Sequence, residues 1–243
     1  MRLDQAIAQR YPELSRRKAR ELISLRRVLV NDRPVAVASR EVKESDRISI
    51  AEELELTVIR ETADWIAIDK PPGMATSPAR ERTVRSLEEH LRLRYGTIFV
   101  VHRIDTQTSG VVVFAKTKAA AAELSALFAA REISKTYLAV AEGGIEKETV
   151  IESPIGGKDA HTIVRPLKQL EGMTLLEAEI LTGRMHQIRI HLRSIERPVV
   201  GDRRYGSTMR APRMLLHAWK LGHRYFGETL VAPVPRDFPT VSS

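Results

Sequence analysis

One short polar stretch of this chain holds the residue types best suited to catalysis. It reads His102-Arg103-Ile104-Asp105-Thr106-Gln107-Thr108-Ser109-Gly110 and runs directly into the apolar segment 111–115. Asp105 is its only acid. Because a buried strand holds the adjoining loop rigidly, this position suits a reactive side chain. A single loop aspartate is more often a turn former, so the interpretation of Asp105 as a catalytic carboxylate depends on the rest of the sequence.

A second polar segment has the spacing of an amphipathic helix over residues 184–195, with Thr182 in place to cap it. The apolar positions of this helix are predicted to lie in the core, and they are Met185, Ile188, Leu192 and Ile195. The other side carries His186, Arg189 and Arg193, which could reach phosphates or lie in solvent. We include Arg189 among the predicted RNA contacts.

The residue content limits the other chemistries. The chain has no cysteine, which excludes disulfides, thiolate catalysis and cysteine-based zinc sites. A metal-dependent hydrolase would have to use His102, Asp105, His186 and His191. His186 and His191 are five residues apart, so a helix would not bring them to one face as a ligand pair. We therefore expect no metal site, and a test of metal dependence would separate the hydrolase interpretation from one that needs no metal.

The composition indicates a cytosolic globular protein. Hydrophobic residues make up 43% of the 243 residues, and no apolar run approaches the roughly 20 residues that span a bilayer. An acid at position 4 interrupts any N-terminal signal segment. We expect a cytoplasmic monomer with no membrane association.

Positive charge is concentrated at the N-terminus. The formal charge of the chain is +8. Residues 1–50 contain 12 Lys and Arg against seven Asp and Glu, 12 − 7 = +5, so one fifth of the chain carries most of the excess. Arginine predominates there, and its guanidinium suits bidentate contacts to phosphate. This distribution favours a nucleic-acid partner.

The first fifty residues predict two helices and a hairpin. Apolar residues at helical spacing indicate a helix before Pro12 and a second one after Ser15, which is in place as its N-cap. A strand over 28–30, a turn over 31–34 and a closing strand over 46–50 follow. The predicted RNA contacts lie in and after the second helix: Arg16, Arg17, Lys18, Arg20, Arg26 and Arg27.

The acid-rich residues 51–58 are the predicted linker to a second domain over 59–243. That domain mixes short strands, among them 65–69, 111–115, 137–140 and 175–181, with a few helices, including 84–93 and one capped by Thr117. The strands do not alternate regularly with helices, so we assign the α+β class.

Both parts resemble known families. Arg2-Leu3-Asp4, Ser15-Arg16-Arg17-Lys18-Ala19 and Arg27-Val28-Leu29-Val30-Asn31 resemble the small RNA-binding domain named for ribosomal small-subunit protein four. The stretch around Asp105 resembles the signature of the bacterial RluA-type (ribosomal large subunit) pseudouridine synthases. Further segments resemble other motifs of that family and occur in the family's order. One precedes the Asp105 stretch, Lys70-Pro71-Pro72-Gly73-Met74. The others come after it: Lys135-Thr136-Tyr137-Leu138-Ala139-Val140, Thr182 to Leu192, Pro198-Val199-Val200-Gly201-Asp202, Tyr205-Gly206, Leu215-Leu216-His217-Ala218 and Ala232 to Phe238. Met185 stands where the family usually has threonine.

The resemblance implies a mixed, mainly antiparallel sheet with flanking helices and a central cleft. It implies that Asp105 is the catalytic residue, that Arg184 pairs with it, and that Tyr137 is the active-site tyrosine, which would stack on uracil. It places Leu216 at the uracil pocket. His102, Arg103 and Thr108 flank Asp105 and are assigned to the substrate pocket.

The resemblance also implies an enzyme that converts uridine to pseudouridine in RNA without a cofactor. Ribosomal RNA is the first expectation for the substrate and transfer RNA the second. The main alternative is a non-catalytic RNA-binding protein on the same scaffold, which would have no use for Asp105, Tyr137 and Arg184 together.

Overall fold

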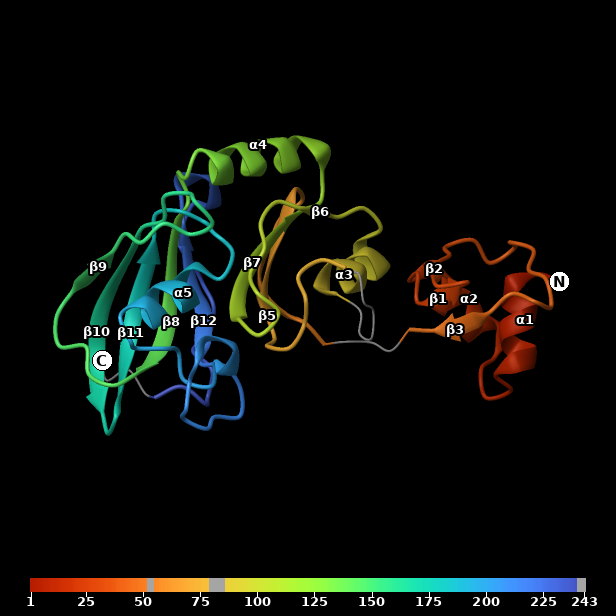
Figure 1. Cartoon of the computed structure of the whole chain (residues 1–243). Helices are drawn as coiled ribbons and strands as arrows, with labels where there is room; N and C mark the ends of the chain where they lie inside the picture. Colours follow the sequence, from red (N-terminus) through yellow and green to blue (C-terminus); the bar gives the residue numbers. More distant parts are fainter. Residues whose placement is uncertain (52–54, 79–85, 240–243) are drawn as a thin grey trace. The chain divides into compact units, whose positions relative to one another are not determined.

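The computed structural model describes residues 1–51, 55–78 and 86–239 (Figure 1). The chain packs as two compact units. One comprises residues 1–55 together with 88–98, and the other comprises residues 56–87 together with 99–243. Each unit has its own hydrophobic core.

The N-terminal unit has the predicted helix–helix–hairpin order: α1 (Leu3–Arg10), α2 (Arg16–Ser24), β1 (Val28–Val30), β2 (Arg33–Pro34) and β3 (Ile48–Ile50). The strands pair antiparallel in the order β2-β1-β3. The Ser15 hydroxyl accepts a hydrogen bond from the Lys18 amide and caps α2. Asn31 and Asp32 both have positive φ, which is typical of a two-residue type I′ hairpin turn.

A third helix, α3 (Leu87–Tyr95), belongs largely to this unit although it comes later in the chain. Leu93 forms a small buried cluster with Leu29 and Ala51. The predicted helix over 84–93 is thus found, but its first two residues lie outside the described ones. A domain boundary taken from a shift in composition could not predict this return of the chain.

In the described part of the chain, the second unit is built on one ten-stranded sheet. Its strands are β4 (Thr57–Glu61), β5 (Trp65–Lys70), β6 (Phe99–Val100), β7 (Ser109–Ala115), β8 (Ser134–Glu142), β9 (Thr149–Ile151), β10 (Thr162–Leu170), β11 (Met173–Ile180), β12 (Leu216–Gly222) and β13 (Leu230–Val231). The main path is β4-β5-β7-β12-β8-β11-β10-β9, with β6 on β7 and β13 on β12. Every pairing is antiparallel except β7 with β12, which confirms the mixed, mainly antiparallel prediction.

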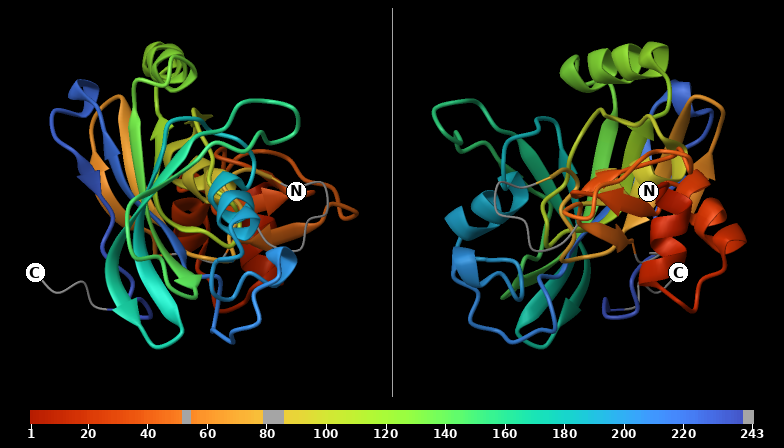
Figure 2. Two further views of the ribbon diagram at one scale, coloured as in Figure 1. Left: turned by 60° about the vertical axis from the view of Figure 1, so that its left-hand side comes forward. Right: turned by 90° about the vertical axis from the view of Figure 1, so that its right-hand side faces the viewer.

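Two helices of this unit pack against the sheet, each in its own cluster of apolar side chains (Figures 1 and 2). α4 (Lys118–Ala129) begins at Thr117, whose hydroxyl caps it, and it buries Leu124 against β7. α5 (Gln187–Ser194) buries Ile188 and Leu192 against β8 and β11. Tyr137 of β8 borders both clusters. Across the described ranges, every helix is too short or too polar to cross a membrane.

The parallel pair β7–β12 requires a glycine at its start. Gly110 pairs with Ala218 and has a φ of +113°. A Cβ atom at this position would lie 2.1 Å from the carbonyl oxygen of Ala218. Only glycine tolerates both the conformation and the close approach. The strand that follows the Asp105 loop is therefore fixed tightly against the centre of the sheet.

A buried carboxylate organises the N-terminal unit. The Asp4 side chain is fully buried and accepts hydrogen bonds from Arg2, Arg16 and Arg20 at 2.8–3.2 Å. Burial raises the pKa of Asp4, but these hydrogen bonds outweigh burial and lower its pKa to about 2. Arg16 and Arg20 were predicted only as RNA contacts, yet they also hold the fold together. Arg17 is exposed and makes no such pair in the described residues.

We expect Asp4→Asn to lower the local unfolding free energy of this unit by about 1–3 kcal/mol at neutral pH, measured by hydrogen exchange of the α1 and α2 amides in the full chain. Because the pKa of Asp4 is lowered in the folded state, its contribution is present above about pH 4 and is lost as the pH falls toward 2. The difference between wild type and variant should therefore shrink in acid. Arg17→Ala is the control and should leave the exchange unchanged. Equal protection in Asp4→Asn and wild type would show that the cluster contributes nothing.

Candidate active site

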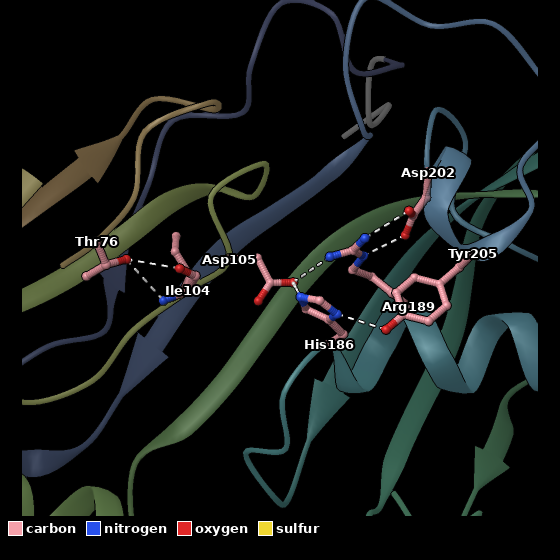
Figure 3. Close-up of polar contacts among 7 residues, drawn as sticks. All are labelled: Thr76, Ile104, Asp105, His186, Arg189, Asp202 and Tyr205. Carbon is pink, nitrogen blue, oxygen red and sulfur yellow. Dashed lines mark hydrogen bonds and ion pairs between the residues drawn. The ribbon is translucent and has the colours of Figure 1, made fainter. Parts of the chain in front are cut away.

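Asp105 lies in the loop between β6 and β7, and its side chain is 24% exposed. Ile104, the residue before it, is held by hydrogen bonds to both its backbone amide and its carbonyl group. The Thr76 hydroxyl donates to the carbonyl oxygen of Ile104 at 3.0 Å and accepts from the Ile104 amide at 3.3 Å (Figure 3). The carboxylate therefore projects from a backbone that cannot move freely.

The residue after Asp105 is fixed as well. The ammonium group of Lys70, at the end of β5, is fully buried and donates to the carbonyl oxygens of Pro71, Met74 and Thr106 at 2.7–3.2 Å. The Gly73 amide donates to the same Thr106 oxygen at 2.8 Å. Burial lowers the pKa of Lys70 to about 7, against the opposing effect of the Asp105 charge. The Lys-Pro-Pro-Gly motif thus acts on the loop that carries Asp105.

Arg189 of α5 is the arginine that pairs with Asp105. Its Nη1 lies 3.2 Å from Oδ2 of Asp105, while Nε and Nη2 donate to the two oxygens of Asp202 at 2.6 and 2.9 Å (Figure 3). The guanidinium also lies 4.8 Å from the centre of the Tyr205 ring, a cation–π distance. Burial alone would lower the pKa of Arg189, but Asp202 and Asp105 together raise it. Arg189 is thus a permanently charged side chain, fixed in its orientation, that lies beside the Asp105 carboxylate.

The expected pair of Arg184 with Asp105 is wrong. Arg184 donates from Nε to the carbonyl oxygen of Asp159 at 2.9 Å. Arg189, which we assigned to RNA, is instead buried at the site. The cause is the helix start, because α5 begins at Gln187 rather than at residue 184, after a left-handed turn at His186 with φ 56°. The helix that exists therefore presents a different arginine to Asp105.

The same shift changes two further predictions for this segment. Thr182 does not cap the helix, since its hydroxyl donates to Oε1 of Gln187 and accepts from the His161 amide. Met185 is 74% exposed rather than part of the core. Gln187 also donates to Thr162, so the polar residues of the motif hold the loop before α5 to β10.

The four residues of the hydrolase alternative do not come together. His191 uses Nδ1 on the Thr162 hydroxyl and Nε2 on the Ser153 carbonyl oxygen. His102 accepts a hydrogen bond from the Val113 amide at 2.9 Å. Within the described ranges no three His, Asp or Glu side chains gather as a metal site would require.

His102 has a structural role in this fold, and its place in the substrate pocket remains a prediction. Besides its bond to Val113, its ring stacks on Phe128 of α4 at 4.3 Å. Burial lowers the pKa of His102 to about 3, with a smaller effect of Lys135, so the ring stays neutral and can accept. Of the other pocket predictions, Arg103 is exposed, and Thr108 is buried with its amide on the Asp105 carbonyl oxygen at 3.1 Å.

Tyr137 and Leu216 lie on neighbouring strands. Burial raises the pKa of the Tyr137 phenol, and the Asp105 charge raises it further. A phenol that holds its proton this firmly is suited to stacking and not to acting as a base at neutral pH. Leu216 of β12 pairs with Ala139 and is buried in the cluster that holds α5. Its contact with a substrate remains a prediction.

A buried polar network fixes the end of the Asp105 loop to the C-terminal segment. The Ser109 hydroxyl lies 2.9 Å from Nδ1 of His217 and accepts from Arg213 at 3.1 Å. Arg213 in turn donates to both oxygens of Asp237 at 2.6 and 2.9 Å. Two motifs seen in the sequence, around His217 and Asp237, therefore act on the start of β7.

Comparison with known proteins identifies the families that the two parts of the chain match. A family model described as RNA pseudouridylate synthase matches residues 64–194, and one described as S4 domain matches residues 1–48. A protein from Nitrosomonas europaea named ribosomal large subunit pseudouridine synthase D is 33% identical over 98% of this chain and 82% of its own length. A protein of the same name from Haemophilus influenzae is 31% identical over 98% of this chain and 89% of its own.

The fold also has solved neighbours. The structure called human RNA pseudouridylate synthase domain containing 1 superposes with a TM-score of 0.65 at 25% identity, covering 79% of this chain and 87% of its own. A second human structure, RNA pseudouridylate synthase domain containing 4, gives 0.63 at 21% identity over 74% of this chain and 89% of its own, and supports the fold alone.

We expect Arg189→Met to lower the free energy of unfolding by about 3–5 kcal/mol, because it leaves the buried Asp202 carboxylate unpaired. Arg184→Met removes one hydrogen bond to a carbonyl oxygen and should cost no more than about 1 kcal/mol. Urea unfolding of the two full-length variants, side by side, makes the comparison. A larger loss in Arg184→Met would mean that the pairing is the one predicted from the sequence and not the one described.

Proposed function

Because the chain belongs to the RNA pseudouridylate synthase family, we propose that it isomerises uridines of ribosomal RNA to pseudouridine and that Asp105 is its catalytic residue. The observation that carries the assignment is the Asp105 carboxylate, partly exposed in a clamped loop and paired with a buried arginine. The choice of ribosomal RNA is supported by the relatives named ribosomal large subunit pseudouridine synthase. Transfer RNA is the second candidate.

The reaction breaks the bond between ribose and N1 of uracil, turns the base and joins ribose to C5. A carboxylate is needed at the ribose, as nucleophile at the anomeric carbon or as base at the adjacent carbon. The proton that leaves C5 is balanced by one gained at N1, so uridine and product are isomers. The detached base must also be retained while it turns, which favours an enclosed site.

Three residues of the described site fit these needs. Asp105 supplies the carboxylate, Arg189 holds it in one orientation, and Tyr137 offers a ring for the base to stack on. A uridine within folded RNA must be flipped out to reach them. The alternative of a binding protein without catalysis leaves the clamped and paired carboxylate unexplained.

The N-terminal unit supplies sequence-independent affinity in this proposal. Its excess of positive charge suits phosphate contacts, which position RNA and do not select the base. Arg17 and Lys18 lie on the exposed side of α2, and Arg17 has no ion pair in the described residues. Arg27 donates to the Ala51 carbonyl oxygen and so has a structural role too. The boundary at 51–58, the monomeric state and the cytoplasmic location stay predictions.

The decisive variant is Asp105→Asn, which keeps the shape of the side chain and removes its charge. We expect the full-length variant to bind unmodified large-subunit ribosomal RNA with wild-type affinity and to form no pseudouridine under single-turnover conditions. Pseudouridine is mapped by chemical labelling and primer extension on ribosomal and transfer RNA in parallel. Modification confined to transfer RNA would replace the proposed substrate, and turnover by a pure Asp105→Asn preparation would overturn the catalytic assignment.

A further inference from the structure

His186 occupies a strained position directly beside the site. It is the residue before α5, and its φ of 56° is uncommon for a residue other than glycine and costs on the order of 1 kcal/mol. Its side chain makes no capping hydrogen bond to the helix. It points instead between Asp105 and Tyr205 (Figure 3). Helix capping therefore does not account for the left-handed conformation of His186.

Both ring nitrogens of His186 face polar partners. Nδ1 lies 2.8 Å from the Tyr205 hydroxyl, and the two rings meet edge to face with centres 5.6 Å apart. Nε2 lies 3.8 Å from Oδ2 of Asp105, and the side chain is only 13% exposed. The second distance is longer than a hydrogen bond, but catalytic contacts of this kind tighten when substrate fills a site. The imidazole is thus held between a phenol and the reactive carboxylate.

The surroundings favour one protonation state. Charged and titratable groups face the ring from three places: Asp105 before β7, Arg189 in α5, and Asp202, Arg204 and Tyr205 at η1 (Arg203–Tyr205). Burial lowers the pKa of His186. The carboxylates oppose this and the two arginines reinforce it, so the pKa stays below its ordinary value. The ring is therefore neutral at neutral pH, with one donor and one acceptor nitrogen.

The partners also select the tautomer. A carboxylate can only accept, so the nitrogen that faces Asp105 must carry the proton. That leaves Nδ1 of His186 as the acceptor for the Tyr205 hydroxyl, which completes a chain from phenol through imidazole to carboxylate. The reverse tautomer would place a lone pair against the charge of Asp105.

The Tyr205–His186 pair and Arg189 converge on the same carboxylate oxygen of Asp105. Arg189 approaches Oδ2 of Asp105 at 3.2 Å and His186 approaches it at 3.8 Å. In the described part of the chain, Oδ1 of Asp105 has no side-chain hydrogen bond or ion pair, since those of Asp105 all fall on Oδ2. A carboxylate held at one oxygen keeps the lone pairs of the other for a substrate.

We propose that His186, oriented by Tyr205, is a positioning residue of the isomerisation: with Arg189 it holds Oδ2 of Asp105 and leaves Oδ1 as the oxygen that acts on the ribose. The proposal rests on the proposed function and adds no bond-forming step to it. It assigns a role to the strained turn, to the histidine of the arginine motif and to the tyrosine that follows Asp202.

The test compares two substitutions at one position. His186→Gln keeps an N–H donor near the place of Nε2, and His186→Ala removes it. At pH 7.5 and saturating unmodified large-subunit ribosomal RNA, we expect the single-turnover rate of His186→Ala to fall by at least about tenfold and that of His186→Gln to stay within about threefold of wild type. Tyr205→Phe should fall between them. Met185→Ala, at the exposed neighbour, is the matched control and should keep the wild-type rate.

The pH profile separates positioning from a purely structural role. Protonation of His186 in acid places a hydrogen on Nδ1, which can then no longer accept a hydrogen bond from the Tyr205 hydroxyl. The wild-type rate should therefore fall on the acid side of the pH–rate profile, and His186→Gln should lack this acid limb. If His186→Ala does not fold, His186→Gln and Tyr205→Phe still give this readout. Wild-type rates in His186→Ala, or an unchanged acid limb in His186→Gln, would overturn the proposal. Absence of pseudouridine with the wild-type protein would instead overturn the proposed function.

Discussion

The proposed active site depends on one buried cation. Arg189 is only 8% exposed in its side chain, so its charge must be compensated inside the protein. Asp202 does this with two hydrogen bonds, and the planar geometry of the guanidinium then fixes where the remaining N–H groups point. One of them points at Asp105. The orientation of the Asp105 carboxylate is therefore set by a second carboxylate, Asp202, that lies after α5.

The remaining elements bring Asp105 to this cation. Thr76 and Lys70 hold the residues on either side of it, Lys70 from the end of β5 and Thr76 from the segment that follows. The parallel pairing at Gly110 and the network on Ser109 fix the start of β7. Burial of the apolar face of α5 against β8 and β11 fixes the other half of the site. Two halves that are far apart in sequence thus meet at one ion pair.

Motif and periodicity predicted much of this arrangement. The strand at 111–115, the cap at Ser15 and the turn at Asn31 depend on local chemistry and are confirmed by the structure. The membership of the family is carried by short motifs in order. These features are local, so the sequence alone contains their causes.

The sequence-based predictions that were wrong share one physical cause: the residues concerned bind partners that lie far away in the sequence. A helix over 184–195 follows from apolar spacing, yet the loop is held by Gln187 to β10, and α5 starts three residues later. This change exchanged the roles of Arg184 and Arg189. Likewise the sequence reveals only the positive charge of Arg16 and Arg20, because their partner Asp4 lies in the preceding helix. The two arginines of this motif can be told apart only once the hydrogen-bond partners of each are known.

We infer that Asp202, which lies outside the Asp105 loop, controls the Asp105 carboxylate through Arg189. It is tested most directly by the single-turnover rate of Asp202→Asn at saturating ribosomal RNA. The amide keeps the shape of the side chain but cannot hold the guanidinium with two acceptor oxygens. We expect a rate at least about tenfold below wild type with unchanged RNA affinity, since a small displacement of a reacting group is costly. A wild-type rate in a correctly folded Asp202→Asn protein would contradict it.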